Sequence, residues 1–306
     1  MWSYTLRRVL ATLPTMLAVI SVCYFLLHAT PGGPFDSERQ VSAAVLANLQ
    51  AKYHLDLPLW QQYLLYLQSL LHGDLGASFR YADWSVNDLV ANALPVSAAI
   101  GGGSLILSMI IGVGLGIVAA LRQNSVTDHF VMLIGNVGSA VPSFIIGPVL
   151  IIVFAILLKW LPAGGWHDFE LRFMVLPMTL LTFINVSVIG RVMRGSLIEV
   201  MHSNFIRTAR AKGLPTRVVV LRHALKPALL PVVSLVGPLA ISSITSALVT
   251  ETVFSLPGLG KLIVNGAGNR DYTLVLGLVV LVAVLTVALN LLVDLAYAWL
   301  DPKIRY

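Results

Sequence analysis

Six long runs of apolar residues dominate the pattern of this chain. Each run is near or above the ~20 residues that a helix needs to cross about 30 Å of hydrocarbon. A soluble core could explain one or two shorter runs, but not this many of this length. The pattern therefore predicts an all-α integral membrane protein with six spans: Val9–Ala29, Ser97–Leu121, Phe130–Leu158, Phe173–Val192, Leu229–Val253 and Thr273–Trp299.

Two of these runs need comment. The first follows Arg7 and Arg8, is longer than the apolar part of a signal peptide and lacks a small-residue cleavage motif, so we expect an uncleaved span. The third is too long for a straight crossing and contains Pro142 and Pro148. Because proline interrupts helical hydrogen bonding, we expect a kink, a tilt or an end at the membrane interface.

Composition supports the membrane interpretation. The chain is 57% hydrophobic and 11% charged, with a mean hydropathy of +0.85, whereas a soluble domain has about 25% charged residues. The single cysteine, Cys23, lies within the first apolar run. It can form neither a disulfide within the chain nor a multi-cysteine metal site, and we expect it to pack as a small apolar side chain.

The distribution of charge predicts the orientation. With the N-terminus inside, the inner segments hold 13 of the 20 Lys and Arg residues and the outer segments hold 7, together with most acids. Since cytoplasmic loops carry the Lys and Arg excess, we expect both termini in the cytoplasm. The pI near 9.6 then reflects membrane topology, and no nucleic-acid partner is expected.

This topology divides the chain into a first span with its cytoplasmic N-terminus (1–29), an extracytoplasmic loop (30–96) and a five-span core (97–306) containing a cytoplasmic loop (193–228). Loops of this size are usually functional or disordered. The outer loop has the pattern of two short helices divided by Pro58. Its aromatic residues suit a membrane surface, where such side chains gather; they are Trp60, Tyr63 and Tyr66.

Several motifs resemble functional sites but lack the necessary context. The stretch SLPGLGKL has Ser255 and Leu262 where a phosphate-binding loop needs Gly and Ser or Thr. The glycines of GVGLG (112–116) lie within a span, where they favour a close helix contact. The glycosylation pattern at 185–187 also lies within a span. No grouping of catalytic side chains is found, so we expect no enzyme and no metal site.

The stretch NFIRTARAKGLP, residues 204–215, has the pattern of a short cytoplasmic helix. Three cations would each cost ~2.5–3.5 kcal/mol at the centre of a membrane helix, which keeps this stretch out of the bilayer. Asn204 can cap the helix, Gly213 can close it with a positive φ, and Pro215 prevents its continuation. About 8–9 residues remain.

An isolated helix of this length is not stable in water, so the rest of the chain or a partner must hold it. The small residues Thr208, Ala209 and Ala211 allow another surface to approach closely, and the cations favour an acidic surface. Contact with anionic lipid is the alternative that the pattern leaves open.

This stretch, FIRTARAKGL, and the following VVVLRHALKPALLPV resemble the cytoplasmic loop of the permease subunits of binding-protein-dependent ABC importers. Gly213 stands at the glycine of that family's motif, and Arg207-Thr208-Ala209 replaces its usual Glu-Ala-Ala. The departure is typical of the peptide and nickel branch. Further similar stretches are LRRVLATLPTMLAVISVCYFLLHATPGGPF, HGDLGASFRY, VPSF, ETVFSLPGLGKLIVNGAGNRDYTLV and LVDLAYAWLDPKIRY.

The resemblance implies a type I importer fold in a bacterial inner membrane and a pore-forming rather than enzymatic role. The implied partners are a homologous second permease, two cytoplasmic ATPase subunits that bind ATP and Mg, an extracytoplasmic peptide-binding protein and membrane lipid. The implied substrate is an oligopeptide, with dipeptide or nickel as alternatives. A secondary transporter is a further alternative, although the spans carry almost no mid-membrane charge. The implied ATPase-coupling residues are Asn204, Phe205, Ile206, Arg207, Thr208, Ala209, Arg210, Ala211, Lys212 and Gly213.

A second candidate site lies near the outer end of the fifth span. An ionisable residue in a span is a functional candidate, so Glu251 is expected at the translocation path or a gate, with solvation at the interface as the alternative. Pro257, Gly258 and Gly260 predict a break in the helix there. Near the inner end of the last span, Asp294 is expected to pair with Arg191 or Arg194.

Overall fold

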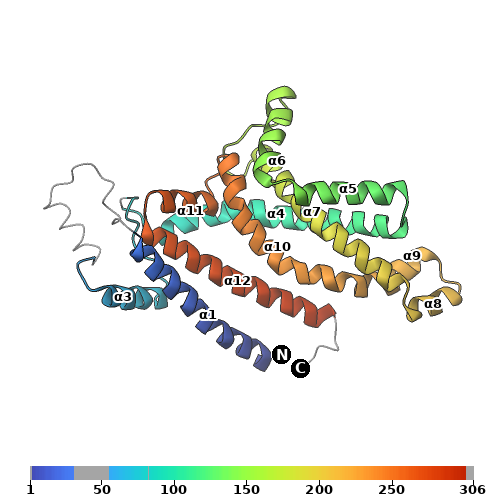
Figure 1. Cartoon of the computed structure of the whole chain (residues 1–306), viewed down its shortest axis with the longest axis horizontal. Coiled ribbons are helices and arrows are strands. Elements are labelled where there is room, and N and C mark those ends of the chain that lie inside the picture. The colour runs from blue at the N-terminus through green and yellow to red at the C-terminus, as the bar shows by residue number, and fades with distance from the viewer. Residues whose placement is uncertain (1, 31–54, 82, 301–306) are drawn as a thin grey trace. The chain divides into compact units, whose positions relative to one another are not determined.

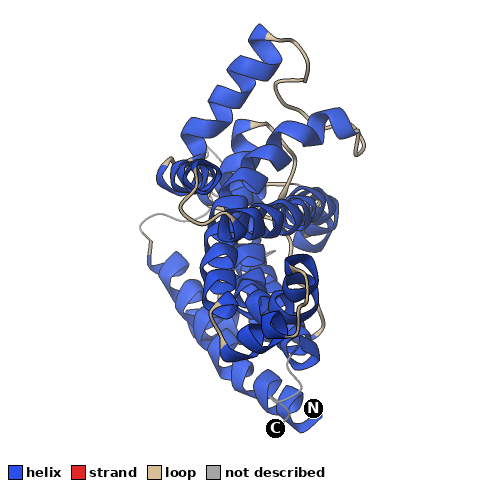
Figure 2. Ribbon diagram, turned by 90° about the vertical axis from the view of Figure 1, so that its right-hand side faces the viewer, coloured by secondary structure: helices blue, strands red, loops and turns tan. Residues whose placement is uncertain are grey.

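The computed structural model describes residues 2–30, 55–81 and 83–300, and over these ranges the chain folds into helices joined by loops (Figure 2). It forms two compact units, Val96–Gly260 with Leu285–Tyr306, and Trp2–Pro95 with Lys261–Val284. The helices are α1 (Trp2–Ala29), α3 (Leu59–Leu71), α4 (Val86–Leu121), α5 (Val126–Ala140), α6 (Ser143–Leu150), α7 (Leu171–Met201), α8 (Asn204–Ala211), α9 (Thr216–Val218), α10 (Leu225–Val253), α11 (Leu259–Gly268) and α12 (Tyr272–Leu300), with π-helices η1 (Ile151–Leu157) and η2 (Val219–Ala224) (Figure 1).

The spans follow the predicted pattern. Five helices within the described ranges are long and apolar enough to cross a membrane, and a bent pair brings the number to six if it counts as one span. Each spanning helix begins before its apolar run, and the difference is largest for α4, which begins at Val86, and for the continuous α9–η2–α10 helix, which begins at Thr216. Helical hydrogen bonding continues past the hydrocarbon into polar flanks, so apolarity alone marks only the membrane part.

The third run is kinked, as its prolines predict. The axes of α5 and of the helix 143–157 (α6 with η1) differ by 108° across a break at Val141 and Pro142. Pro142 is the N-cap of α6, where its missing N–H costs nothing. Pro148 lies inside α6, and the helix widens into η1 immediately beyond it. The break therefore comes from Pro142.

The glycines of the GVGLG stretch place α4 directly against α7. A Cβ on Gly112 would lie 2.8 Å from Ile189 Cγ2, and one on Gly116 would lie 2.8 Å from the carbonyl oxygen of Gly190. The predicted helix contact is confirmed, because only glycine allows so close an approach.

Polar side chains inside this unit are paired between helices. Asn185 is buried and donates through Nδ2 to Ser243 Oγ at 3.0 Å, and Thr182 donates to the carbonyl of Ser104 at 3.3 Å. The apparent glycosylation motif at 185–187 is thus buried, as expected for a span.

The other unit has an aromatic cluster between α1 and α3. Tyr24 stacks on His28 and Tyr66 with ring centroids 4.2 and 5.7 Å apart, and Tyr63 shares a 2.6 Å hydrogen bond with Ser21. Burial raises the pKa of the Tyr66 hydroxyl. Helix α3 is the second helix predicted in the outer loop, beginning after Pro58. The first predicted helix lies largely outside the described residues.

The same unit joins two stretches that are far apart in the sequence. Asp271 is fully buried and accepts from the hydroxyl of Ser78, from the N–H of Phe79 at 3.1 Å and from the N–H of Leu274 at 3.2 Å. Arg80 donates through Nε to the carbonyl of Asn269 at 2.8 Å. One buried carboxylate therefore caps α12 and anchors the HGDLGASFRY stretch.

Candidate functional site

Helix α8 follows α7 after only His202 and Ser203, and lies with α9 where α7 ends and α10 begins (Figure 1). It has 8 residues, as the sequence predicts. Ile206 and Ala209 are buried; they are three residues apart and so share one face. The other eight residues of the predicted coupling segment are exposed: Asn204, Phe205, Arg207, Thr208, Arg210, Ala211, Lys212 and Gly213.

The chain's own core holds the buried face of α8. Ile206 is fully buried and Ala209 is 6% exposed, in a cluster contributed by α7, η2 and α10. The buried members of this cluster are Ile189, Met193, Leu197, Ile206, Ala209, Val219, Ala224, Ala228 and Val232. Burying an Ile side chain contributes about 1.5–3 kcal/mol, which explains how so short a helix persists.

This arrangement identifies the surface that Ala209 approaches. The sequence predicted that its small size lets another surface come close, and that surface is the chain's own core. Thr208 and Ala211 are exposed and remain available at the surface, with the Thr208 hydroxyl donating to the carbonyl of Asn204 at 3.1 Å. The exposed face thus combines Phe205, which is 50% exposed, with cations.

The two ends of α8 are defined differently from each other. Asn204 is the first helical residue rather than the cap, so that prediction is wrong: the N-cap is Ser203, and its hydroxyl donates back to the carbonyl of Val200 at 2.6 Å. At the other end the prediction is confirmed. Gly213 has φ 77° and donates its N–H to the carbonyl of Arg210 at 2.9 Å, and Pro215 begins the next helix as its N-cap.

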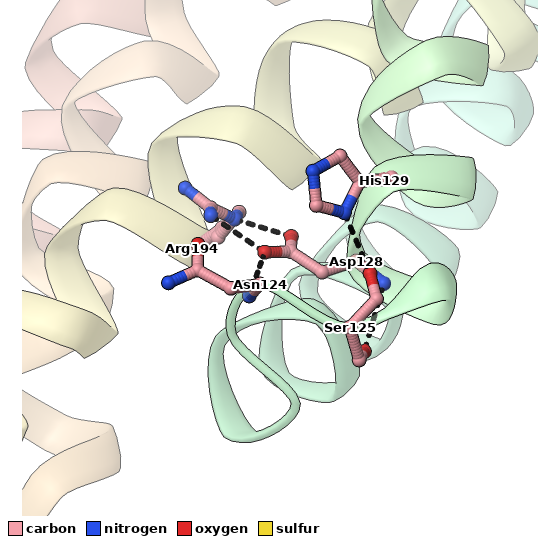
Figure 3. Close-up of polar contacts among 5 residues, drawn as sticks. All are labelled: Asn124, Ser125, Asp128, His129 and Arg194. Carbon is pink, nitrogen blue, oxygen red and sulfur yellow. Dashed lines mark hydrogen bonds and ion pairs between the residues drawn. The ribbon is translucent and has the colours of Figure 1, made fainter.

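A partly buried ion pair joins the start of α5 to the C-terminal part of α7 (Figure 3). Arg194 donates through Nε to Asp128 Oδ1 at 2.5 Å and through a terminal nitrogen to Oδ2 at 2.7 Å. The carboxylate is 2% exposed and also accepts from the N–H of Asn124 at 2.8 Å. Ser125 caps α5 by accepting from the N–H of Asp128 at 3.3 Å.

The sequence interpretation missed this pair and assigned Asp294 to Arg191 or Arg194. The side chain of Asp294 lies outside the described residues, but the acid bound to Arg194 is Asp128. A signal was present, since Ser125-x-x-Asp128 before an apolar run is a helix-start pattern. It locates the helix start and gives no information about the partner on α7.

The second candidate site is a loop built on a buried carboxylate. Glu251 is fully buried and accepts from Ser97 Oγ at 2.5 Å and from the N–H of Gly260 at 2.8 Å. Ser97 Oγ in turn accepts from the N–H of Leu259 at 2.8 Å. The alternative of a solvated glutamate at the interface is therefore wrong. The carboxylate ties the start of α11 to α10 and α4.

The residues after Glu251 form the predicted break between α10 and α11. A Cβ on Gly260 would lie 2.2 Å from Leu248 Cα, which is backbone, so this position requires glycine; a Cβ on Gly258 would lie 2.1 Å from a Glu251 oxygen and would displace that carboxylate. Pro257 is exposed. Phe254, 1% exposed, packs in the core, and its carbonyl accepts from the N–H of Gly165 at 2.8 Å. The structure brings these residues together around Glu251.

Metal chemistry finds no support in the described part of the chain. No three His, Cys, Asp or Glu side chains there lie close enough together to hold a metal ion.

Comparisons with known proteins agree over the whole chain. The oligopeptide transport system permease protein OppB of Escherichia coli K12 is 52% identical over 306 residues, covering 100% of both chains. OppB of Salmonella typhimurium is 53% identical with the same coverage. The dipeptide transport system permease protein DppB of Bacillus subtilis is 39% identical over 302 residues, covering 99% of this chain and 97% of that protein.

Solved structures share the fold. Inward-facing forms of the MetNI methionine ABC transporter align with TM-scores of 0.55 and 0.57 at 20% and 16% identity. The alignments cover 68% and 70% of this chain and 95% and 96% of the matched chains.

Two family profiles match in chain order. The N-terminal region of binding-protein-dependent transport system membrane components matches residues 1–100, and the inner membrane component of such systems matches residues 112–306. This decides against the secondary transporter considered above. The chain belongs to the family of inner membrane components of binding-protein-dependent transport systems.

Proposed function

We propose that this chain is a pore-forming permease subunit of an ATP-driven, binding-protein-dependent importer of oligopeptides, and that α8 is its contact with an ATPase subunit. The observation that supports the ATPase contact is the way in which α8 packs against the rest of the chain. Its buried face is fixed to the chain's own core, while Phe205, Arg207 and Arg210 project outward. An apolar side chain among cations suits a cleft with an apolar floor and an acidic rim.

The full-length identity to oligopeptide permeases supports the substrate class. Dipeptide import is the alternative, favoured by the 39% identity to DppB, and nickel import remains the other alternative from the resemblance. The remaining partners are a second, homologous permease, two cytoplasmic ATPases that bind ATP and Mg, and an extracytoplasmic peptide-binding protein. ATP-driven closure of the ATPases would draw the coupling helices together and reorient the spans, with Glu251, Pro257, Gly258 and Gly260 at the translocation path or gate.

The proposed topology places both termini and residues 193–228 in the cytoplasm, and residues 30–96 outside. In a Cys23→Ser background, single cysteines at the exposed positions Leu71 and Ala211 can be probed with an impermeant thiol reagent. In spheroplasts we expect labelling at position 71 and none at position 211. The reverse pattern would overturn the topology and, with it, the ATPase contact.

The ATPase contact is tested by removing the cations. Arg207→Ala combined with Arg210→Ala and Lys212→Ala should leave the abundance of the chain unchanged and release the ATPase subunits on purification. The matched control is Arg217→Ala, which removes an exposed cation just beyond α8. The test is run in neutral-lipid nanodiscs, where a lipid contact contributes nothing. Full ATPase retention there by the triple variant would refute the proposal.

The substrate class is tested by import into liposomes containing the whole complex. Tri- to pentapeptides should be imported with ATP and with loaded binding protein, whereas Ni²⁺ should not. Exchanging the binding protein for one with other peptide preferences should change the imported set. Import of dipeptides alone, or of Ni²⁺, would replace the oligopeptide assignment by that alternative.

A further inference from the structure

The contacts between α5 and α7 lie at successive levels along both helices. Beginning at the end of α7, Arg194 binds Asp128 of α5. Further back, a Cβ on Gly135 would lie 3.5 Å from the carbonyl of Ser187 and 3.7 Å from Arg191 Cγ. Gly138 approaches the same serine so closely that its own Cβ would overlap Ser187 Oγ. Positions rise along α5 as they fall along α7, so the two helices are antiparallel and in direct contact.

The α7 segment that contacts α5 also belongs to the hydrophobic cluster that buries one face of α8. Met193 and Leu197 lie on either side of Arg194 in the sequence, and both are fully buried in the cluster that receives Ile206 and Ala209. One helical turn of α7 thus contributes apolar side chains to the cluster that receives α8, and contacts α5 through a charged side chain.

The ion pair is built to hold a fixed geometry. Two parallel N–H···O contacts to one carboxylate fix both the separation and the orientation of the helices, which a single contact would not. Asp128 is held in turn by the N–H of Asn124, and Ser125 fixes the first turn of α5. Figure 3 shows the carboxylate between the guanidinium and the turn before α5.

We propose that Asp128 and Arg194 are positioning residues for transport: they make α5 follow the cytoplasmic end of α7, so that a displacement received at α8 moves the α5–α6 span. This rests on the proposed role of α8. The consequence extends further along the chain. Residues of α6 and η1, including Ile146 and Phe154, pack in the cluster that contains Phe254 and Leu256 of the loop after Glu251.

The direct test measures whether α5 and α7 move together. In the Cys23→Ser background, spin labels are placed at two exposed positions, Val126 on α5 and Glu199 on α7, within the full reconstituted complex. In the otherwise wild-type chain, the distance between the labels should be the same without nucleotide and in the ATP-trapped state. A change on trapping would overturn the proposal, because α5 would then not follow α7.

The distance between the two labels is then measured in a variant that lacks the ion pair between Asp128 and Arg194. Taking away one partner leaves a buried uncompensated charge and could prevent folding, so the variant of choice is Asp128→Asn with Arg194→Gln, which removes both charges together. The distance should then change or broaden on trapping, and peptide imported per ATP should fall roughly tenfold, within the range by which substitutions along a coupled network alter coupling. An unchanged distance and ratio would show a purely structural pair and refute the proposal.

The matched control is Arg191→Gln on the same turn of α7. The Arg191 guanidinium donates to the backbone of Ser187 in its own helix at 3.1 Å, and Gln keeps the side-chain carbons near the backbone. This variant should import normally. The distance measurement does not depend on where the ATPase binds, and ATPase retention is scored separately. The experiments therefore distinguish a wrong assignment of α8 as the ATPase contact from a wrong assignment of the ion pair as a positioning element.

Discussion

Helix α8 and the loop after Glu251 are both short elements with glycine at or near their ends. Apolar packing holds the first in place, and hydrogen bonds to a buried carboxylate hold the second. Apolar contacts of Ile206 and Ala209 seat α8, and its polar side chains face outward. The loop after Glu251 is organised around a buried carboxylate that accepts from Ser97 and Gly260. The charged side chains of α8 are exposed at the surface, whereas the carboxylate of Glu251 accepts hydrogen bonds inside the fold.

The comparison predicts that the loop tolerates substitution least. Gly260→Val would place a branched side chain 2.2 Å from the Cα and 2.5 Å from the backbone N of Leu248, atoms that cannot move aside. We expect loss of the folded chain from the membrane, measured by abundance and thermal stability. Gly102→Val is the matched control, since a Cβ there meets nothing within 4 Å. Normal abundance of the Gly260 variant would mean that the loop is not tightly packed.

The second-largest effect is expected on the buried face of α8. Ile206→Ala removes a fully buried side chain and should cost about 2–5 kcal/mol locally, detected as faster amide hydrogen exchange in 204–211. Phe205→Ala, at the neighbouring half-exposed position, should leave that exchange unchanged. Equal effects of the two variants would contradict the division of α8 into a buried and an exposed face.

A milder change tests the buried carboxylate. Glu251→Gln keeps the shape but replaces one accepting oxygen with a donor, so either Ser97 or Gly260 loses its acceptor. A buried group left without a partner costs about 1–3 kcal/mol, which should appear as a lower thermal midpoint of the purified complex. Glu170→Gln, at an exposed glutamate, serves as the control. An unchanged thermal midpoint would mean that the hydrogen bonds of Glu251 do not contribute to the stability of the loop.

The smallest effect is expected at Gly213. A Cβ there meets nothing within 4 Å, so Gly213→Ala suffers only the strain of a positive φ. That strain is about 1 kcal/mol, visible as a slight lowering of the thermal midpoint. Gly195→Ala, in the open interior of α7, should instead be neutral or slightly stabilising. A large loss from Gly213→Ala would reveal a contact at this position that the fold alone does not provide.

Local chemistry explains what the sequence predicted well. The kink at Pro142, the positive φ of Gly213 and the length of α8 each follow from one or two neighbouring residues. The inward direction of Ala209 was recoverable too. Ile206 and Ala209 form an apolar pair three residues apart, which predicts a buried face on so short a helix.

Contacts between distant residues were not predictable in this way. Asp128 meets Arg194, and Asp271 meets Ser78, across many intervening residues. Each sequence position admits several partners, and only the packing of helices selects one. The burial of Glu251 depends likewise on Ser97, from another helix. An ionisable residue in a span therefore indicates a special role, but the sequence alone does not show whether that role is in transport or in folding.

The ion pair between α5 and α7 also bears on how the bent pair of helices would cross a bilayer. Neither α5, with 15 residues, nor α6 with η1 reaches ~30 Å alone, so the bent pair could be one crossing or a hairpin that re-enters. Asp128 at the start of α5 lies beside Arg194 near the end of α7, so these two points share one side. If α7 crosses the membrane once, its beginning lies on the opposite side, and the chain between α5 and α7 must already have crossed. The bent pair is then one crossing rather than a hairpin that re-enters, which is what the proposed topology requires.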